Sequence, residues 1–337
     1  MNRSHPTMKP LVVFLLTEYP QLSQTYKENE ARALMQYCEV KIISLASHDT
    51  PYKDHLPFEH AKSKQEALRI CQKLKPHIIH SHYLHLTHLA HKAALLCGCK
   101  YTIRTHSFDV IGKHVDYLSQ YKDAINSDRC CGIICFPFLK KNFVEAGIKS
   151  HKIFTSYPVV DVKRFANRGD NGQGILNVGA AIPKKNMQEF FFIADKNPGI
   201  TFNLYAIGYN VEELKQQNNS IHNRVNIKKC VEPWLMAREY KQHHWLLYTA
   251  CPYLKTVGWP MAIAEAQASG LGILMRNIRP DLKEYIGGAG FLYNTPDEAS
   301  NILRNKYPED MREKGFKIAE RSSLNTHLQL LQTIWSQ

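Results

Sequence analysis

Short apolar runs alternate with longer amphipathic segments along the first half of the chain. Five stretches have helical apolar spacing: residues 26–37, 64–74, 84–96, 115–125 and 139–146. The runs around them have the length of buried strands: residues 11–16, 40–45, 78–81, 101–105, 132–136 and 153–156. Strands that alternate with helices predict a parallel, doubly wound sheet.

A polar stretch with three glycines, residues 167–174, interrupts this pattern and is the best linker candidate. The pattern then restarts with strands predicted at 175–178, 201–206, 225–228, 245–248, 272–275 and 290–292. Helices are predicted at 186–195, 211–216, 233–241, 260–269, 280–286, 295–304, 309–321 and 324–335. We therefore expect two α/β domains, with ligands bound at the carboxyl ends of the strands in a cleft between them.

Composition is that of a globular protein, with 22% charged and 44% hydrophobic residues among 337. No apolar run approaches the roughly 20 residues that span a bilayer. The apolar run Leu11–Leu16 ends at Glu18 and Pro20, which favours a buried strand over a signal peptide. The nine cysteines are odd in number and lack Cys-x-x-Cys spacing, so we expect reduced thiols in a cytoplasmic protein.

The formal net charge is +13, and the excess is larger in the first half. Residues 1–157 hold 21 Lys and Arg against 13 Asp and Glu, leaving 22 against 17 for the rest. Such an excess favours anionic partners. No nucleic-acid-binding signature accompanies it, so nucleic acid is not expected, and phosphorylated ligands or acidic lipids remain. Aromatic residues and lysines mix in Phe136–Val144, which fits either a membrane-facing surface or a core-facing helix.

The segment Val257–Ala266 carries the most specific chemistry. It reads as a turn, a proline at a helix start (Pro260) and an Ala-rich helix that stops at Gly270. Glu265 is the lone carboxylate on this helix, and burying it without a partner is costly. A ligand with paired hydroxyls, such as a ribose, is one suitable partner.

This segment resembles the donor-binding motif of GT-B glycosyltransferases, particularly the retaining enzymes of family 4 that build exopolysaccharides. Five other segments resemble the family in the expected order: Glu18–Tyr26, His77–Tyr83, Tyr101–Asp109, Pro158–Phe165 and Asn177–Asn186. The resemblance implies an α/β fold of the GT-B type, with two Rossmann-like doubly wound domains facing a central cleft. It places the acceptor-side domain at 1–166, the donor-binding domain at 175–322, and a helix that crosses back to the first domain at 323–337.

The implied activity is transfer of a sugar from a nucleotide-diphosphate-sugar to an acceptor hydroxyl, with retention and without a metal or other cofactor. The acceptor would be a saccharide or a lipid-linked saccharide in surface polysaccharide or glycoconjugate synthesis. The protein would then be cytoplasmic, with peripheral contact between its basic first domain and the inner face of the membrane.

Two positions depart from the family pattern. The motif has two glutamates eight positions apart, and Val257 replaces the first of them. An arginine that binds the diphosphate is replaced by Ala180, while the partner lysine is kept as Lys185. A degenerate, non-catalytic relative that binds a saccharide or a partner enzyme is therefore the main alternative, and a sugar-nucleotide epimerase is another.

The resemblance implies that Glu265 binds the ribose and that lysines on the first strand–helix loop of the second domain bind the diphosphate. These lysines could instead be a solvated helix start. Two arginines could supply the missing guanidinium or lie on the surface, and an aromatic residue could replace the lost glutamate. The donor-binding candidates are Gly179, Lys184, Lys185, Trp259, Glu265, Arg276 and Arg279.

The catalytic candidates implied by the resemblance are His106, Lys185 and Asp109. His106 would lie near the reacting sugar, where nearby backbone stabilises developing charge. Asp109 would orient His106 or its loop. Five further histidines cluster at 80, 82, 85, 88 and 91, but the last four repeat every three residues and drift round a helix, and no carboxylate joins them in sequence. A polar helix is thus favoured over a metal site.

Overall fold

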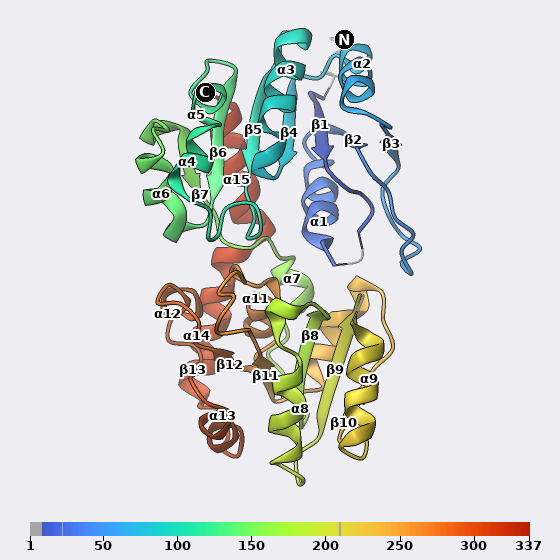
Figure 1. Ribbon diagram of the computed structural model, residues 1–337, viewed down its shortest axis with the longest axis vertical. Coiled ribbons are helices and arrows are strands. Elements are labelled where there is room, and N and C mark those ends of the chain that lie inside the picture. The colour runs from blue at the N-terminus through green and yellow to red at the C-terminus, as the bar shows by residue number, and fades with distance from the viewer. Residues whose placement is uncertain (1–8, 22, 209) are drawn as a thin grey trace, which may run out of the picture. The chain divides into compact units, whose positions relative to one another are not determined.

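The computed structural model describes residues 9–21, 23–208 and 210–337, which form two compact domains. The first domain contains the described residues up to Gln21, Lys27–Ser156 and Leu328–Gln337. The second contains residues 23–26 and Tyr157–His327. Each has its own parallel sheet (Figure 1), as the alternating sequence pattern predicts.

The first sheet has seven parallel strands in the order β3-β2-β1-β4-β5-β6-β7. Their bounds are β1 Leu11–Leu16, β2 Glu39–Ser44, β3 Phe58–His60, β4 Ile78–His82, β5 Lys100–Arg104, β6 Cys130–Cys135 and β7 Ile153–Thr155. All six strands predicted here are present, with ends shifted by at most two residues. The edge strand β3 was not predicted because its three residues contain no apolar run.

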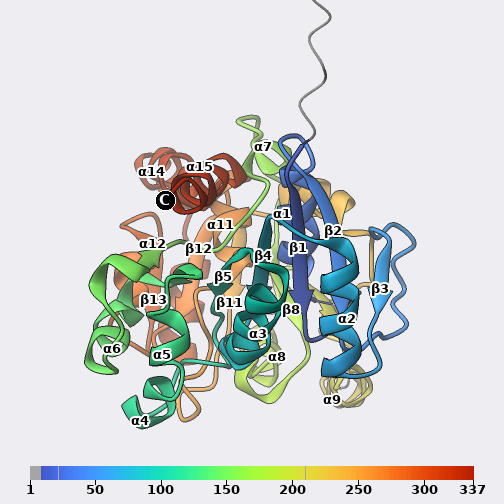
Figure 2. The ribbon, with the colours of Figure 1, turned by 90° about the horizontal axis from the view of Figure 1, so that it is seen from above.

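The helices of the first domain cover both faces of this sheet. They are α1 Thr25–Leu34, α2 Lys64–Leu74, α3 Thr87–Cys97, α4 Val115–Ser119, α5 Lys122–Ile125, α6 Lys140–Glu145 and, from Leu328, α15 Leu324–Trp335. Figure 2 shows α2, α3 and α5 on one side of the central strands and α15 on the other. The helix predicted over 115–125 is two short helices, and the one predicted over 84–96 begins as a 3-10 turn.

Alternation along β5 shows which side chains face which helices. The Tyr101 hydroxyl contacts His91 of α3 (3.3 Å) and donates to the Ala124 carbonyl of α5 (2.6 Å). The next residue, Thr102, accepts from Trp335 Nε1 of α15 (3.3 Å). Thr102 therefore lies on the face of the sheet that α15 covers, opposite the face of Tyr101.

The second sheet has six parallel strands in the order β10-β9-β8-β11-β12-β13. Their bounds are β8 Ile175–Ala180, β9 Phe202–Ile207, β10 Val225–Ile227, β11 Trp245–Tyr248, β12 Gly272–Arg276 and β13 Phe291–Tyr293. The helices are α7 Val162–Phe165, α8 Gln188–Asp195, α9 Val211–Ser220, α10 Met236–Lys241, α11 Met261–Ala268, α12 Leu282–Ile286, α13 Pro296–Leu303 and α14 Glu309–Ala319. Helix α7 was not predicted.

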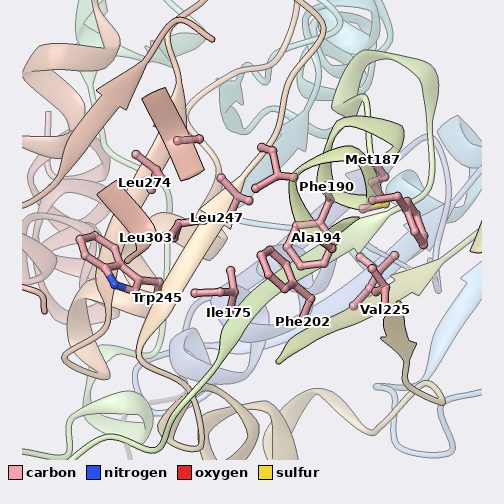
Figure 3. Packing of buried hydrophobic residues seen from close by; sticks show 14 of the residues in the cluster. Ile175, Met187, Phe190, Ala194, Phe202, Val225, Trp245, Leu247, Leu274 and Leu303 are labelled. Carbon is pink, nitrogen blue, oxygen red and sulfur yellow. The ribbon is translucent and has the colours of Figure 1, made fainter. Parts of the chain in front are cut away.

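An apolar cluster lies on one face of the second sheet, under α8 and α13, with Ile175, Phe190, Phe202, Trp245 and Leu274 among its members (Figure 3). The sheet thereby becomes a rigid support for the loops at its carboxyl edge. Within the described residues, no helix is both long and apolar enough to span a bilayer.

Candidate active site

The loop after β8 presents the two lysines predicted to bind phosphate. Its backbone is held by the segment that follows the neighbouring strand β11, because Thr249 Oγ1 donates to the Lys185 carbonyl (2.8 Å) and Cys251 N donates to the Lys184 carbonyl (2.9 Å). Thr249 in turn accepts from Asn177 Nδ2 of β8 (3.2 Å). The position of these lysines therefore follows from the sheet itself.

The Lys185 side chain lies directly over Gly179. A Cβ built on Gly179 would overlap Lys185 Nζ, and Gly179 has φ +138°, a conformation that other residues rarely adopt. The ammonium also sits 5.7 Å from the centre of the Tyr248 ring. Burial and, to a lesser extent, the neighbouring charge of Lys184 together lower the pKa of Lys185 to about 8, while the charge of Glu265 opposes this shift. The site thus holds a cation that a bound anion would stabilise.

Glu265 of α11 lies close enough to Lys185 for the ammonium charge to act on its carboxyl group. Its carboxylate accepts a hydrogen bond from the Tyr240 hydroxyl (2.7 Å). Burial raises the pKa of Glu265, while this bond and the charges of Arg164 and Lys185 lower it. Glu265 stays partly accessible, so it can accept hydrogen bonds from a ligand as well.

The turn before α11 is clamped by Arg279 and Asp281. The Arg279 guanidinium pairs with Asp281 (2.8 Å) and donates to the carbonyls of Lys255 and Val257. Trp259 Nε1 donates to the same Asp281 carboxylate (2.8 Å), and its ring is only 3% exposed. In this geometry Arg279 and Trp259 hold the start of the helix that carries Glu265.

Arg276 lies at the end of β12, beside residues of α8 and β13. Its guanidinium lies 3.5 Å from Glu189 of α8 and 5.4 Å from the centre of the Tyr293 ring. Its buried Nε makes no hydrogen bond to any residue that the structure describes. Two arginines were considered as substitutes for the guanidinium that Ala180 lacks. Of these, Arg276 makes fewer hydrogen bonds within the described residues than Arg279 does.

In the first domain, His106 and Asp109 follow β5. Asp109 accepts from the backbone N–H groups of His106 (2.8 Å) and Leu84 (2.7 Å), and it is 2% exposed. Burial raises its pKa to about 7 against these bonds. Asp109 therefore ties the loop after β5 to the segment after β4, while His106 as a residue is half-buried.

Beside His106 lies an ammonium that the sequence did not single out. Lys27 of α1 donates to the Glu18 carbonyl (3.1 Å) and to Gln21 Oε1 (2.6 Å), and it lies 5.0 Å from the centre of the Tyr83 ring. Burial lowers the pKa of Lys27 to about 7. Tyr83 itself has φ +82°, an uncommon strained conformation for a bulky residue.

The histidine cluster differs from the sequence-based expectation that no carboxylate joins it. A carboxylate does join it, because Glu30 Oε1 of α1 lies 2.8 Å from His80 Nε2 and 3.8 Å from His82 Nε2. All three side chains are fully buried. Sequence spacing could not reveal this, since two strands and one helix separate α1, which carries Glu30, from β4, and His82 ends β4 instead of lying on a helix.

A cavity of about 740 Å³ opens at the opposite, amino-terminal edge of the second sheet. Its walls include Gly174, Thr201, Trp245 and Arg312. The predicted site residues do not line it, and its Arg312 is already paired with Glu309 (3.0 Å). We therefore place the candidate site at the carboxyl edges of the sheets.

The structure thus assembles Gly179, Lys184, Lys185 and Glu265 as one group and His106 with Asp109 as another. Sequence reasoning missed three contributors: Arg164, Tyr240 and Lys27. Arg164 falls within a segment that resembles the glycosyltransferase family, and Lys27 directly follows another, which was the available signal. Nothing in the sequence around Tyr240 pointed to Glu265.

No protein-family model matches the chain, and no curated protein does. Solved structures match over nearly its whole length. HepE (Alr3699) of Anabaena, in complex with UDP, has a TM-score of 0.76 at 15% identity and covers 98% of this chain and 100% of its own. The same protein with UDP-glucose has a TM-score of 0.75 at 14% identity, with coverage of 97% and 100%.

Two further similar structures come from other organisms. Sucrose-phosphate synthase of Thermosynechococcus elongatus has a TM-score of 0.69 at 12% identity, covering 97% of this chain and 99% of its own. A glycosyltransferase of Rickettsia africae has a TM-score of 0.66 at 14% identity, with coverage of 96% and 98%. The neighbours are GT-B glycosyltransferases, and the predicted GT-B fold class, with two Rossmann-like domains, is confirmed. Identities this low establish the fold alone.

Proposed function

We propose that this protein is a retaining glycosyltransferase that moves a sugar from a nucleotide-diphosphate-sugar to an acceptor hydroxyl without a metal ion. The observation that carries the proposal is the half-buried Lys185, whose ammonium is held over Gly179 and interacts electrostatically with Glu265. A cation and a carboxylate in this arrangement suit a diphosphate and a ribose. The similarity to HepE bound to UDP-glucose supports the same class of donor.

In this proposal Lys185 and Lys184 neutralise the diphosphate, and Arg276 supplies the guanidinium that Ala180 lacks. Glu265, oriented by Tyr240, accepts hydrogen bonds from the ribose hydroxyls. Trp259 and Arg279 keep the start of α11 in place. The positive charges of Lys184, Lys185 and Arg276 would then lie beside the nucleoside diphosphate, which becomes more negative as it leaves.

The reaction would break the bond between the anomeric carbon and the β-phosphate oxygen. The acceptor oxygen then bonds to the anomeric carbon, and its proton leaves with the nucleoside diphosphate. His106 would contact the transferred sugar, while Asp109 would act by fixing the loop that carries it. The acceptor would be a saccharide or a lipid-linked saccharide of a surface polysaccharide.

We also propose peripheral contact between the first domain and an acidic membrane surface on the cytoplasmic side. Lys140 and Lys141 of α6 are exposed, whereas Leu139 and Phe143 are buried in the core. The contact would therefore be electrostatic, with little apolar insertion. Co-sedimentation with phosphatidylserine vesicles should be strong at low salt and lost at high salt; salt-independent binding would contradict it.

The transfer reaction itself is the test of the proposed function. The protein is incubated with UDP-glucose and other sugar nucleotides together with saccharide and lipid-linked acceptors, and products are identified by mass spectrometry and the anomeric proton by NMR. We expect one donor to give a product of retained configuration. Lys185→Met should reduce turnover at least tenfold, whereas Lys317→Met, on the exposed surface of α14, should not.

Three results would contradict the proposal. Saturable donor binding without transfer or donor hydrolysis would indicate the non-catalytic relative that Ala180 and Val257 suggest. Conversion of a sugar nucleotide with no acceptor present would indicate an epimerase. Equal turnover of Lys185→Met and Lys317→Met would contradict the proposal that the Lys185 ammonium binds the diphosphate.

A further inference from the structure

A second concave site lies in the second domain, at the sheet edge opposite Lys185 and Glu265. This amino-edge cavity has a volume of about 740 Å³. Its lining comes from the segments that lead into β8, β9 and β11 and from the connection between α13 and α14. The volume lies in the range of small-molecule sites, and none of the donor-binding candidates lines the cavity.

The cavity wall formed by residues 170–174 is fixed to the rest of the domain. Arg312 Nη2 of α14 donates to the Gly169 carbonyl (2.8 Å), which holds the start of this wall. Lys241 Nζ of α10 donates to Asn171 Oδ1 (3.1 Å) within it. The cavity is therefore preformed, and a ligand can enter without rearrangement of this wall.

The floor of the cavity offers no exposed aromatic face. Trp245 is 1% exposed and Tyr307 8% exposed, and their ring centres lie 5.1 Å apart in an edge-to-face contact. The polar atoms of both rings are also engaged, by the carbonyls of Asn305 (3.3 Å) and Ala289 (2.9 Å). A nucleobase, which binds by stacking on aromatic faces, finds no such surface here.

Polar side chains with unused hydrogen-bonding capacity also line the cavity. The side chains of Asp170, Gln173 and Thr201 make no hydrogen bond within the described part of the chain. Carboxylate, amide and hydroxyl groups are suitable partners for the hydroxyl groups of a sugar. The charge of Asp170 acts on the Lys241 ammonium and raises its pKa, so this carboxylate is already partly compensated.

Two cations line the cavity without an ion-pair partner among the described residues. They are Arg304 and Lys306, two positions apart between α13 and α14. Arg304 Nε donates to Asn197 Oδ1 (3.2 Å), which leaves the outer nitrogens of its guanidinium for a ligand. The third cation of the lining, Arg312, is paired with Glu309 (3.0 Å). Arg304 and Lys306 therefore carry the positive charge available to an anion.

His244 adds a neutral donor to these cations. Its Nε2 accepts a hydrogen bond from the Tyr307 backbone N–H (3.1 Å). Burial lowers the pKa of His244, and the charge of Lys306 lowers it as well, so the ring is neutral and its single proton lies on Nδ1. This N–H group has no hydrogen-bond partner among the described residues. The effect of Lys306 on the ring also shows that the ammonium lies near it.

We propose that the amino-edge cavity is a binding site for a small phosphorylated saccharide. Arg304, Lys306 and His244 hold the phosphate. Two cations match the charge of nearly −2 that a phosphate monoester carries at neutral pH, whereas a carboxylate carries a single charge. The remaining polar side chains of the lining bind the sugar hydroxyls. The site shares no residue with the donor site and does not rest on the proposed function.

A hollow filled only by solvent is the competing explanation, because Arg304 and Lys306 are exposed. Exposed charges on a flat surface bind anions weakly, but a concave site concentrates their field on one position. The two explanations differ in whether binding saturates and whether it depends on these two charges.

The test is nitrogen-15 NMR of the full-length protein with labelled tryptophan, titrated with glucose 6-phosphate. The chain has four tryptophans. Trp245 borders the cavity, whereas Trp259 lies beside the start of α11 in the candidate donor site. Their indole signals are assigned by Trp245→Phe and Trp259→Phe. We expect a saturable shift of the Trp245 signal, half complete at or below about 1 mM, and no shift of Trp259.

Arg304→Met and Lys306→Met should each weaken this binding at least about fivefold, because each removes a charged donor to the phosphate. Lys317→Met is the matched control, since Lys317 is exposed on α14 and does not line the cavity. Inorganic phosphate and glucuronate should bind more weakly than glucose 6-phosphate. Equal affinity for inorganic phosphate would overturn the role given to the sugar, and equal affinity for glucuronate the role given to the phosphate.

Two further results would overturn the proposal. One is the absence of a saturable Trp245 shift with all three probes, or equal affinity in Arg304→Met, Lys306→Met and Lys317→Met. The other is a response confined to Trp259 and abolished by Lys185→Met, which would assign the binding to the donor site. The probes contain no nucleotide and the readout requires no sugar transfer, so this proposal and the glycosyltransferase function can fail separately.

Discussion

At the scale of single residues, the candidate donor site depends on one close approach. Lys185 lies over Gly179. A side chain at position 179 would occupy the space of the Lys185 ammonium, and the backbone there has a conformation that only glycine adopts readily. Gly179→Ala should therefore displace Lys185 and weaken donor binding by tenfold or more, as measured by calorimetry. Gly98→Ala, also at positive φ (+69°) but in open space, should leave donor affinity unchanged. Equal affinities for the two variants would contradict the placement of Lys185.

The Lys185 amine also predicts a pH dependence. Its pKa is lowered to about 8 by burial, so the free protein binds the anionic donor best below pH 8 and more weakly above it. Donor binding near pH 8.5 should take up a proton, seen as a binding enthalpy that varies with the ionisation enthalpy of the buffer. Lys185→Met should abolish this uptake. The same shift disfavours the charged amine in the folded state, so the Lys185 contribution to stability rises between pH 8 and 10.5.

At the scale of elements, the second sheet relies on a glycine packed against an indole ring. Gly272 of β12 pairs directly with Trp245 of β11, and a Cβ at 272 would overlap the Trp245 ring. Gly272→Ala should lower the free energy of unfolding by about 1–3 kcal/mol, the usual cost of overpacking. Urea unfolding followed by Trp fluorescence measures it. Gly199→Ala, in open space without positive φ, should be neutral, and a comparable loss there would show that the effect is unrelated to packing.

Element by element, the sequence predicted well wherever a pattern was local. Leu11–Leu16 and Trp245–Tyr248 are strands with the predicted bounds, because a short apolar run is a sufficient signal for a buried parallel strand. The three-residue strand β3 and the four-residue helix α7 carry no such pattern. Glu265 and Lys185 were recognisable because they lie within motifs of contiguous residues.

The remaining site residues were out of reach for a physical reason. Glu30 and His80 lie on α1 and β4, with two strands and a helix between them in sequence, and Tyr240 and Glu265 are 25 positions apart. Only the order of strands in each sheet brings these pairs together. The correction to the histidine cluster has the same origin, since the carboxylate that completes it arrives from α1.

At the scale of the whole molecule, two parallel-sheet domains of the GT-B class each present charged groups at the carboxyl edge of their own sheet. The second domain holds the group suited to a sugar nucleotide, and the first holds His106 on its buried support. Because structural neighbours at 15% identity or less show only the fold, the proposed activity rests on these groups.

The most direct test of the glycosyltransferase account is calorimetric binding of UDP-glucose and of GDP-, ADP-, CMP- and dTDP-sugars to the wild-type protein and to Glu265→Gln. We expect saturable binding of one donor class, weakened at least tenfold in the folded Glu265→Gln variant, because the ribose hydroxyls lose a charged acceptor. Absence of binding by every sugar nucleotide to the folded wild-type protein, or equal affinity in Glu265→Gln, would contradict it.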